Sequence, residues 1–334
     1  MTARRAFGIV IAALLVASLG APGTADAWAP RVPRQSDRAP KLDPRMPRRP
    51  AAPTLPGAPG CSVFPASNVW NRRIDGRAVA SNSATMISAI GLDRGLHMDF
   101  GSYAGYGIPY QVVTASTPRS TVTFDYDDES DHVGYPIPAN PLIEGGPGAT
   151  GDRHILMVDR DGCRLYELFA ARLPSGNWRA GSGATWDLTS NALRPAGWTS
   201  ADAAGLPILP GLVRYDEVAA GTIAHALRFT TNHTREAYIY PARHEAGEST
   251  STSLPPMGLR VRLKASYDTS DFSPHARAIA VALQRYGMIL ADNGSPWYIS
   301  GMSDSRFDDD VLHELDVITG HDLEVVDTSG FVNG

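Results

Sequence analysis

The feature that most limits the fold of this chain is a series of short apolar or alternating segments, separated by clusters of Gly, Pro, Asn and Asp. Each segment has the length of a β-strand and is rich in Val, Ile, Leu, Tyr or Phe. The pattern predicts a mostly β domain, an antiparallel β-sandwich of jelly-roll type with long loops. The expected strands are residues 109–114, 121–126, 154–158, 163–169, 224–230, 237–240 and 259–264.

Helical periodicity is clear only toward the C-terminal end. Within residues 274–285 the apolar side chains recur at helical spacing, and Ser273 followed by Pro274 is typical of a helix start. A weaker pattern covers residues 309–315. We therefore expect one or two C-terminal helices beside many strands. The chain has no internal repeat, which disfavours a propeller or a solenoid.

Residues 1–27 have the pattern of a cleavable secretory signal peptide. Arg4 and Arg5 precede an apolar run over residues 7–21, and residues 25–27 offer small side chains to a signal peptidase. The paired arginines also resemble the twin-arginine export signature. The apolar run is short for a membrane span of about 20 residues. The sequence predicts a protein that is secreted or held in the cell envelope, with no transmembrane span in the mature chain.

Residues 28–60 are rich in proline and carry seven basic side chains against two acidic ones. Such a segment buries too little apolar surface to offset its ordering entropy, so it predicts a tether ahead of a single domain over residues 61–334. The positive charge could attract an anionic cell envelope. The alternative is a solvated spacer whose charges only keep it soluble.

Charge and cysteine content narrow the partners and the compartment. The predicted domain contains 21 basic and 32 acidic residues, which gives a net charge of −11. Such a surface repels phosphate backbones, so nucleic acid is not expected as a partner. Cys61 and Cys163 are the two cysteines of the chain, and an even number in an exported protein predicts a disulfide between them.

The common catalytic motifs are absent, which removes the simplest routes to serine hydrolase, zinc protease, nucleotide-binding and NAD-dependent functions. Carboxylates, histidines and tryptophans in loops remain. Enzymes that act on polysaccharides use side chains of these types. The most unusual stretch of this kind covers residues 184–218, where two tryptophans lie among carboxylates and prolines. The expected catalytic carboxylates are Asp187, Asp202 and Glu217. The expected substrate-binding side chains are Trp186, Arg194, Trp198, His244 and Trp297.

Structural roles compete with these assignments. Thr199 and Asp202 have the spacing of a helix-capping box, so Asp202 could simply cap a turn. Glu217 could be an ordinary exposed carboxylate. Asp152 and His154 could share a strand face, and a histidine beside a carboxylate can act as an acid, a base or a metal ligand. The residues around His154 do not complete a metal-ligand spacing. The alternative to a functional role is therefore a structural histidine held by hydrogen bonds.

An acidic run offers one weak metal site. Asp125, Asp127 and Glu129 alternate along the sequence, and on a strand their carboxylates would lie on one face and could attract calcium. A solvated acidic loop is the alternative. No other cofactor is expected.

One stretch carries a family resemblance. Residues 191–207, which read NALRPAGWTSADAAGLP, continue into LVRYDE at residues 212–217. This stretch resembles a family of secreted bacterial proteins that has no assigned activity, and the likeness extends from Cys61 to the region of Gly301. It implies a shared exported domain and carries over no functional residue.

Three hypotheses follow for the function. The first is a secreted glycoside hydrolase that acts on a polysaccharide or cell-envelope glycan through two carboxylates. The second is a non-catalytic module that binds carbohydrate or the cell envelope. The third is a structural or adhesive surface protein.

Overall fold

The computed structural model describes residues 51–331. The predicted signal peptide and most of the predicted tether lie outside these residues. The described part is mostly sheet, with several sheets and few helices, as the sequence predicted. In this part of the chain no helix is both long and apolar enough to cross a membrane.

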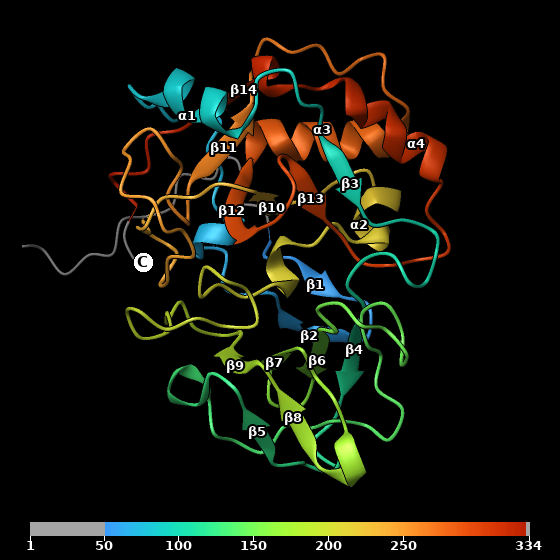
Figure 1. Ribbon diagram of the computed structural model, residues 1–334. Coiled ribbons are helices and arrows are strands. Elements are labelled where there is room, and N and C mark those ends of the chain that lie inside the picture. The colour runs from blue at the N-terminus through green and yellow to red at the C-terminus, as the bar shows by residue number, and fades with distance from the viewer. Residues whose placement is uncertain (1–50, 332–334) are drawn as a thin grey trace, which may run out of the picture. The chain divides into compact units, whose positions relative to one another are not determined.

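A six-stranded sheet forms the upper half of the view in Figure 1. Its middle strands, β11, β12 and β10, are almost entirely buried because side chains pack against both of their faces. β10 runs parallel to β12, and β13 runs parallel to β3, whereas the other pairs are antiparallel. The order is β14 (Leu323–Val325), β11 (Arg260–Leu263), β12 (Met288–Asn293), β10 (Leu227–Thr231), β13 (Tyr298–Ser300) and β3 (His97–Asp99).

A four-stranded sheet lies below it in the same view and separates two hydrophobic clusters. Along β6, Leu156 and Val158 face the main core, whereas Ile155 and Met157 face a smaller cluster that the β5–β8 pair covers. The order is β4 (Tyr110–Val113), β6 (Ile155–Asp159), β7 (Arg164–Phe169) and β9 (Ser182–Asp187); the covering pair is β5 (Val122–Phe124) and β8 (Trp178–Ala180).

Helices are short, and the longest is the one that the sequence predicted. α3 begins at Pro274, ends at Arg285, and packs its buried alanine and leucine side chains against β11. α4 lies beside it (Figure 1). The α-helices are α1 (Ser83–Ile90), α2 (Tyr215–Ala219), α3 (Pro274–Arg285) and α4 (Asp309–His313); the 3-10 turns are η1 (Val69–Asn71), η2 (Asp127–Glu129), η3 (Pro174–Gly176), η4 (Leu209–Gly211), η5 (Glu314–Val317) and η6 (Gly320–Asp322).

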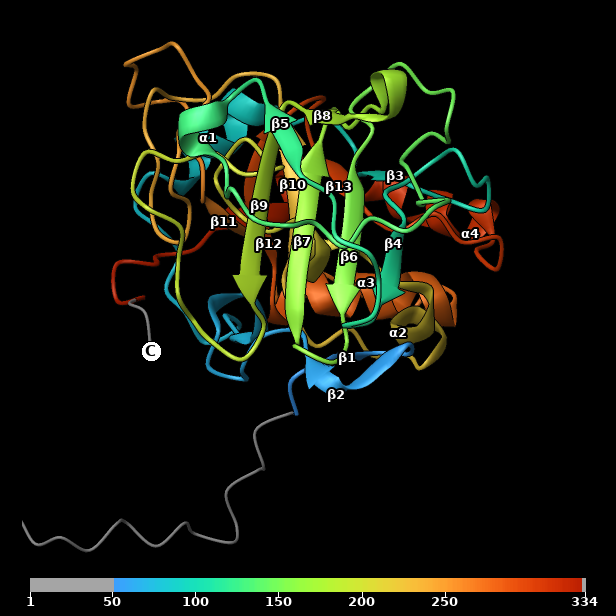
Figure 2. The ribbon, with the colours of Figure 1, turned by 90° about the horizontal axis from the view of Figure 1, so that it is seen from below.

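The finer expectation of an antiparallel jelly-roll sandwich is not confirmed. Four of the described strand pairs run parallel, including β4–β6 and β5–β8, so the sheets are mixed (Figure 2). Parallel neighbours need long connections, and much of the irregular chain between the strands serves that purpose.

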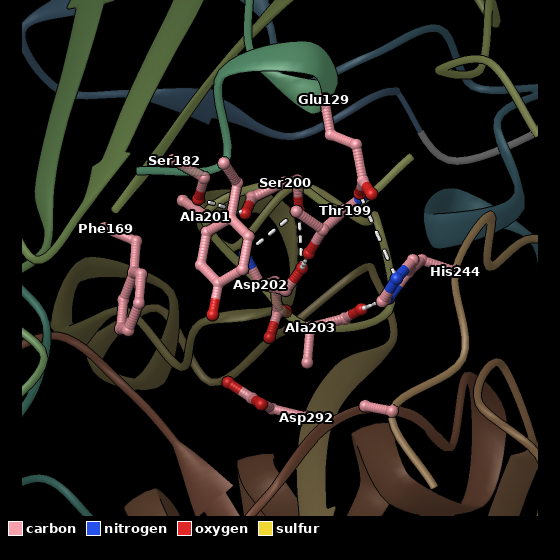
Figure 3. Close-up of a pocket in the computed structure, with 12 residues that line it drawn as sticks. Glu129, Phe169, Ser182, Thr199, Ser200, Ala201, Asp202, Ala203, His244 and Asp292 are labelled. Atoms are coloured by element: carbon pink, nitrogen blue, oxygen red, sulfur yellow. Dashed lines mark hydrogen bonds and ion pairs between the residues drawn. The ribbon is translucent and has the colours of Figure 1, made fainter. Parts of the chain in front are cut away.

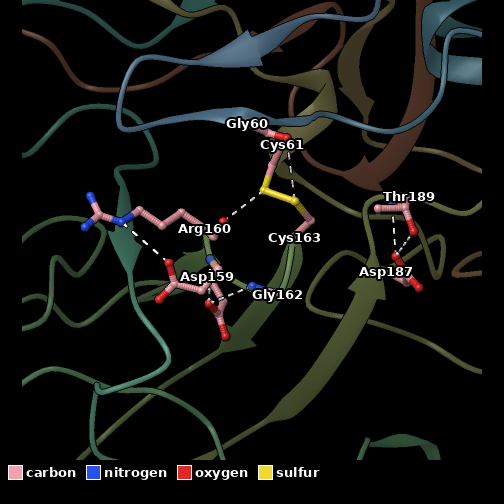
Figure 4. The surroundings of a disulfide bond; sticks show 9 residues. Gly60, Cys61, Asp159, Arg160, Gly162, Cys163, Asp187 and Thr189 are labelled. Atoms are coloured by element: carbon pink, nitrogen blue, oxygen red, sulfur yellow. Dashed lines mark hydrogen bonds and ion pairs between the residues drawn. A yellow bond between two sulfur atoms is a disulfide. The ribbon is translucent and has the colours of Figure 1, made fainter.

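The ordered fold starts before Cys61, at a small hairpin of β1 (Thr54–Leu55) and β2 (Ala58–Ser62). Leu55 and Ala58 of this hairpin are buried, and both belong to residues 28–60, which the sequence assigned to the tether. The predicted disulfide is confirmed: Cys61 on β2 is bonded to Cys163, with Cα atoms 5.3 Å apart (Figure 4). The bridge fastens the first hairpin to the start of β7.

Replacing both Cys61 and Cys163 by serine is expected to lower the free energy of unfolding by about 4 to 5 kcal/mol, because the bridge closes a loop of 102 residues. Urea denaturation of the two proteins measures the difference. Reductant added to the unmodified protein should reproduce the loss. A change of less than about 1 kcal/mol would show that the bridge hardly restricts the unfolded chain.

Candidate functional site

Side chains from both sheets line a cavity of about 290 Å³, here called cavity 1 (Figure 3). Phe169 and Ser182 reach it from the four-stranded sheet, and Asp292 reaches it from the end of β12. The loop over residues 199–203 forms one wall. The cavity contains three carboxyl groups, those of Glu129, Asp202 and Asp292, together with His244 and the rings of Tyr126 and Phe169.

Two of these carboxyl groups, those of Asp202 and Asp292, contact the buried Arg228. Asp202 is fully buried, and both of its oxygens accept hydrogen bonds from Arg228, at 2.6 Å from Nη2 and 3.1 Å from Nε. Nη2 of Arg228 also lies 3.3 Å from an oxygen of Asp292. A bidentate guanidinium–carboxylate pair fixes direction as well as distance, so it sets where the Asp292 carboxyl can lie.

An irregularity in strand pairing brings Asp292 to this arginine. Arg228 pairs with Ile289 in the parallel β10–β12 ladder, and a regular ladder would then pair Thr230 with Ala291. The register shifts between Phe229 and Thr230, so Thr230 pairs with Asp292 instead. Strand irregularities of this kind re-aim a side chain from one face of a sheet to the other.

The environment of Asp292 keeps its carboxyl group protonated near neutral pH. Burial raises the pKa of Asp292 to about 8, the nearby Asp202 carboxylate adds to the rise, and Arg228 opposes it. A carboxyl group with a raised pKa can donate a proton at neutral pH, which is what a general acid requires.

Glu129, from η2, has a different environment in the same cavity. Its Oε2 accepts a hydrogen bond of 2.7 Å from the backbone N–H of Thr199, and its side chain is about 29% exposed. His244 lies opposite: Nδ1 is 2.9 Å from the carbonyl oxygen of Ala203, and Nε2 is 3.9 Å from Glu129 Oε2. A carbonyl oxygen only accepts, so Nδ1 of His244 carries a proton.

The buried His154 supports the loop over residues 199–203, which forms one wall of cavity 1. Nδ1 of His154 is 2.7 Å from Oε2 of Glu144, and Nε2 is 3.0 Å from the carbonyl oxygen of Ala201. Both ring nitrogens therefore donate, so the ring is a cation. Burial lowers the pKa of His154, but the hydrogen bond and the charge of Glu144 raise it overall to about 9. The sequence suggested Asp152 as the partner, whereas Glu144 supplies the hydrogen bond.

The three expected catalytic carboxylates lie in three different environments. Asp202 lines cavity 1. Asp187 is exposed at the end of β9, where it accepts hydrogen bonds from the backbone and hydroxyl of Thr189 (Figure 4). Glu217 lies on α2 and is held by Arg214 at 2.8 Å and His225 at 3.0 Å. Burial opposes ionisation of Glu217, but Arg214 and His225 lower its pKa to about 2. Cavity 1 therefore receives one of the three.

Two of the three expected substrate-binding tryptophans lie in the interior, and Trp198 is partly exposed. Trp186 and Trp297 are buried, and the indole N–H of Trp297 donates to the carbonyl oxygen of Gly91. Neither ring can offer a face to a sugar. Arg194 is buried as well, and its guanidinium contacts the rings of Trp186 and Trp198 and pairs with Asp131. Among the expected substrate-binding residues, His244 is the one that lines cavity 1.

The calcium site is not formed. Residues 127–129 form a 3-10 turn, so the alternating carboxylates do not share a strand face. Asp125 pairs with Arg179, whereas Glu129 turns into cavity 1. Within residues 51–331, no group of three or more His, Cys, Asp or Glu side chains is placed to hold a metal ion.

Comparison of the chain with known protein families, curated proteins and solved structures gives no match. The family resemblance noted for residues 191–217 therefore stays a prediction. Functional reasoning starts from the geometry of cavity 1. Sequence reasoning missed Asp292, Arg228 and Glu144 as site residues; the available signal was that Asp292 interrupts an apolar strand.

The pKa of Asp292 predicts a pH dependence of stability. An unfolded aspartate ionises near pH 3.8, whereas Asp292 in the folded protein does so near pH 8. The folded state thus holds an extra proton in this range, and its stability falls as the pH rises from about 4 to about 8, by at most about 1.4 kcal/mol per pH unit.

Asp292→Asn removes this titration. The unfolding free energy of the variant, relative to the unmodified protein, should therefore rise between pH 4 and pH 8 and level off above. Urea denaturation at each pH measures the difference. Asp268→Asn is the control, because Asp268 is an exposed carboxylate that does not line cavity 1. Parallel profiles for Asp292→Asn and the unmodified protein would contradict a raised pKa.

Proposed function

We propose that this protein is a glycoside hydrolase that acts on an extracellular polysaccharide or cell-envelope glycan. The observation that carries the proposal is a pair of carboxyl groups with contrasting environments in one cavity. Both side chains are partly exposed, 25% for Asp292 and 29% for Glu129. Burial and the neighbouring Asp202 raise the pKa of Asp292 to about 8, whereas Glu129 lies opposite His244 and accepts a hydrogen bond from the backbone N–H of Thr199. Glycosidases need one carboxylic acid and one carboxylate on either side of the bond that they break.

In this mechanism Asp292 donates its proton to the glycosidic oxygen as the bond from that oxygen to the anomeric carbon breaks. Glu129 either attacks the anomeric carbon or takes a proton from the water that attacks it. In the first case, water then releases the sugar and returns a proton to Asp292. Asp202 accepts hydrogen bonds from Arg228 through both of its oxygens, and it lies close enough to Asp292 to raise the pKa of that carboxyl group. Arg228 and Asp202 are positioning residues that hold Asp292.

The architecture and the compartment are compatible with this proposal. The disulfide suits an oxidising, extracellular environment. The sequence predicts export, and the ring of Tyr126, 54% exposed beside cavity 1, offers a sugar an apolar face. That same ring would also serve a carbohydrate-binding module without catalysis, which is the second candidate.

The test uses the full chain secreted from a bacterial host, with its disulfide formed. The protein is incubated with arabinan, mannan, xylan, β-1,3-glucan and chitin, and released reducing ends are measured from pH 4 to pH 9. We expect cleavage of one class, with activity that falls above about pH 8 as Asp292 loses its proton. Asp292→Asn and Glu129→Gln should each lower kcat by a factor of about 100 to 10,000.

Asp268→Asn is the matched control and should retain activity. Loss of activity in Asp187→Asn or Glu217→Gln, with Asp292→Asn active, would restore the sequence-based assignment and overturn this one. Retention on a polysaccharide without product would leave the binding module as the function. If neither cleavage nor retention occurs with any polymer, the carbohydrate proposal is wrong.

A further inference from the structure

A second cavity, here called cavity 2, has a volume of about 440 Å³ and shares Asp292 with cavity 1. Its lining is mainly polar and includes Arg228, His154 and Ser300, which are all buried. Its wall also contains Tyr106 and Tyr298. Buried polar side chains around an open space favour a ligand rich in hydroxyl groups.

The positive charges of cavity 2 are already bound to protein oxygens. Arg228 donates to Asp202, Asp292 and Ser300. His154 donates to Glu144 and to a carbonyl oxygen. The guanidinium of Arg153 donates to backbone carbonyl oxygens, including those of Ala171, Pro147 and Ala149.

Carboxylates in the same lining oppose an anionic ligand. Asp152 is exposed and Asp99 is partly exposed, and both border cavity 2. A uronate or a phosphate placed there would meet these charges, and Arg153, for which no carboxylate partner is among the described ion pairs, already donates to backbone carbonyl oxygens. A neutral sugar avoids this cost and can hydrogen-bond to the same groups.

One wall of cavity 2 is aromatic. The ring of Tyr298 lies 4.2 Å from that of His97, and the hydroxyl of Tyr106 lies 2.7 Å from Nε2 of His97. Tyr106 is 36% exposed. Burial and the charge of Asp99 raise the pKa of Tyr106, so its hydroxyl stays protonated, and it donates to the carbonyl oxygen of Met98 at 3.3 Å. A sugar ring can pack on such a surface while its hydroxyls reach the polar wall.

We propose, on the basis of the hydrolase function above, that cavity 2 binds the leaving saccharide of a neutral polysaccharide and that cavity 1 holds the sugar under attack. The positions of Glu129 and Asp292 determine which cavity holds which part of the substrate. Glu129 lines cavity 1 alone, so the anomeric carbon that it serves belongs there. Asp292 borders both cavities, which is where the acid that protonates the connecting oxygen must lie.

The experiment compares two substrates of the polysaccharide class that the protein cleaves. One is its neutral hexasaccharide. The other is the glycosyl fluoride of the same sugar, in the anomeric configuration of the cleaved linkage. Its leaving group is a fluoride ion, so no saccharide occupies cavity 2. Tyr298→Ala should lower kcat/KM for the hexasaccharide about tenfold, because a stacking surface is lost. The value for the fluoride should change by less than about twofold.

Tyr267→Ala is the matched control, since Tyr267 is also partly buried and stacks on Phe272 but lines neither cavity. It should leave both kcat/KM values unchanged. An equal effect of Tyr298→Ala on both substrates, or no effect on either, would overturn the assignment of cavity 2 while the hydrolase function stands. Preferential cleavage of a polyuronate would overturn the neutral substrate class. If neither substrate is cleaved, the hydrolase proposal itself fails.

Discussion

The buried ion pair between Arg228 and Asp202 is the interaction on which the arrangement of the site depends. It joins the central strand β10 to the loop over residues 199–203, and the same guanidinium reaches Asp292 on β12. Two charges removed from water are costly unless each finds good partners, and loss of one partner typically costs about 3 to 5 kcal/mol. Because Arg228 is the shared partner, three separate segments of the chain keep one geometry.

This shared cation also contacts two carboxyl groups unequally. Both oxygens of Asp202 are bound to Arg228, whereas Asp292 has only a longer contact with it at 3.3 Å. Desolvation therefore dominates at Asp292, and its pKa rises to about 8. The cationic ring of His154 supports the loop through the carbonyl oxygen of Ala201 without approaching within hydrogen-bond distance of Asp292 in the described contacts. The raised pKa of Asp292 thus depends on the contacts that hold the loop over residues 199–203.

Local features of the sequence predicted local structure well. The helix over residues 274–285 and the strand at 164–169 follow from the spacing of their apolar side chains. The disulfide followed from cysteine number and compartment. Asp292 could not be found in this way, because its position depends on a parallel pairing with β10 and on a register shift within that pairing. Trp297 was expected to bind substrate, yet tertiary packing against Phe229 buries it. Residue type and spacing contain no information on these long-range contacts.

The abundance of arginine has a structural use that composition alone does not reveal. The chain has 28 arginines and two lysines, and the buried Arg260 and Arg262 donate to carbonyl oxygens of the irregular segment over residues 69–77. Burial lowers the pKa of Arg260 to about 9, yet the guanidinium satisfies several buried acceptors at once, which the single ammonium of lysine does less well. A fold with so much irregular chain leaves many carbonyl oxygens without sheet or helix partners. Buried arginines supply those partners, and Arg228 extends the same role to the carboxylates of the site. The rigidity that the proposed catalysis at Asp292 requires is therefore produced by the same chemistry that holds the loops elsewhere in the domain.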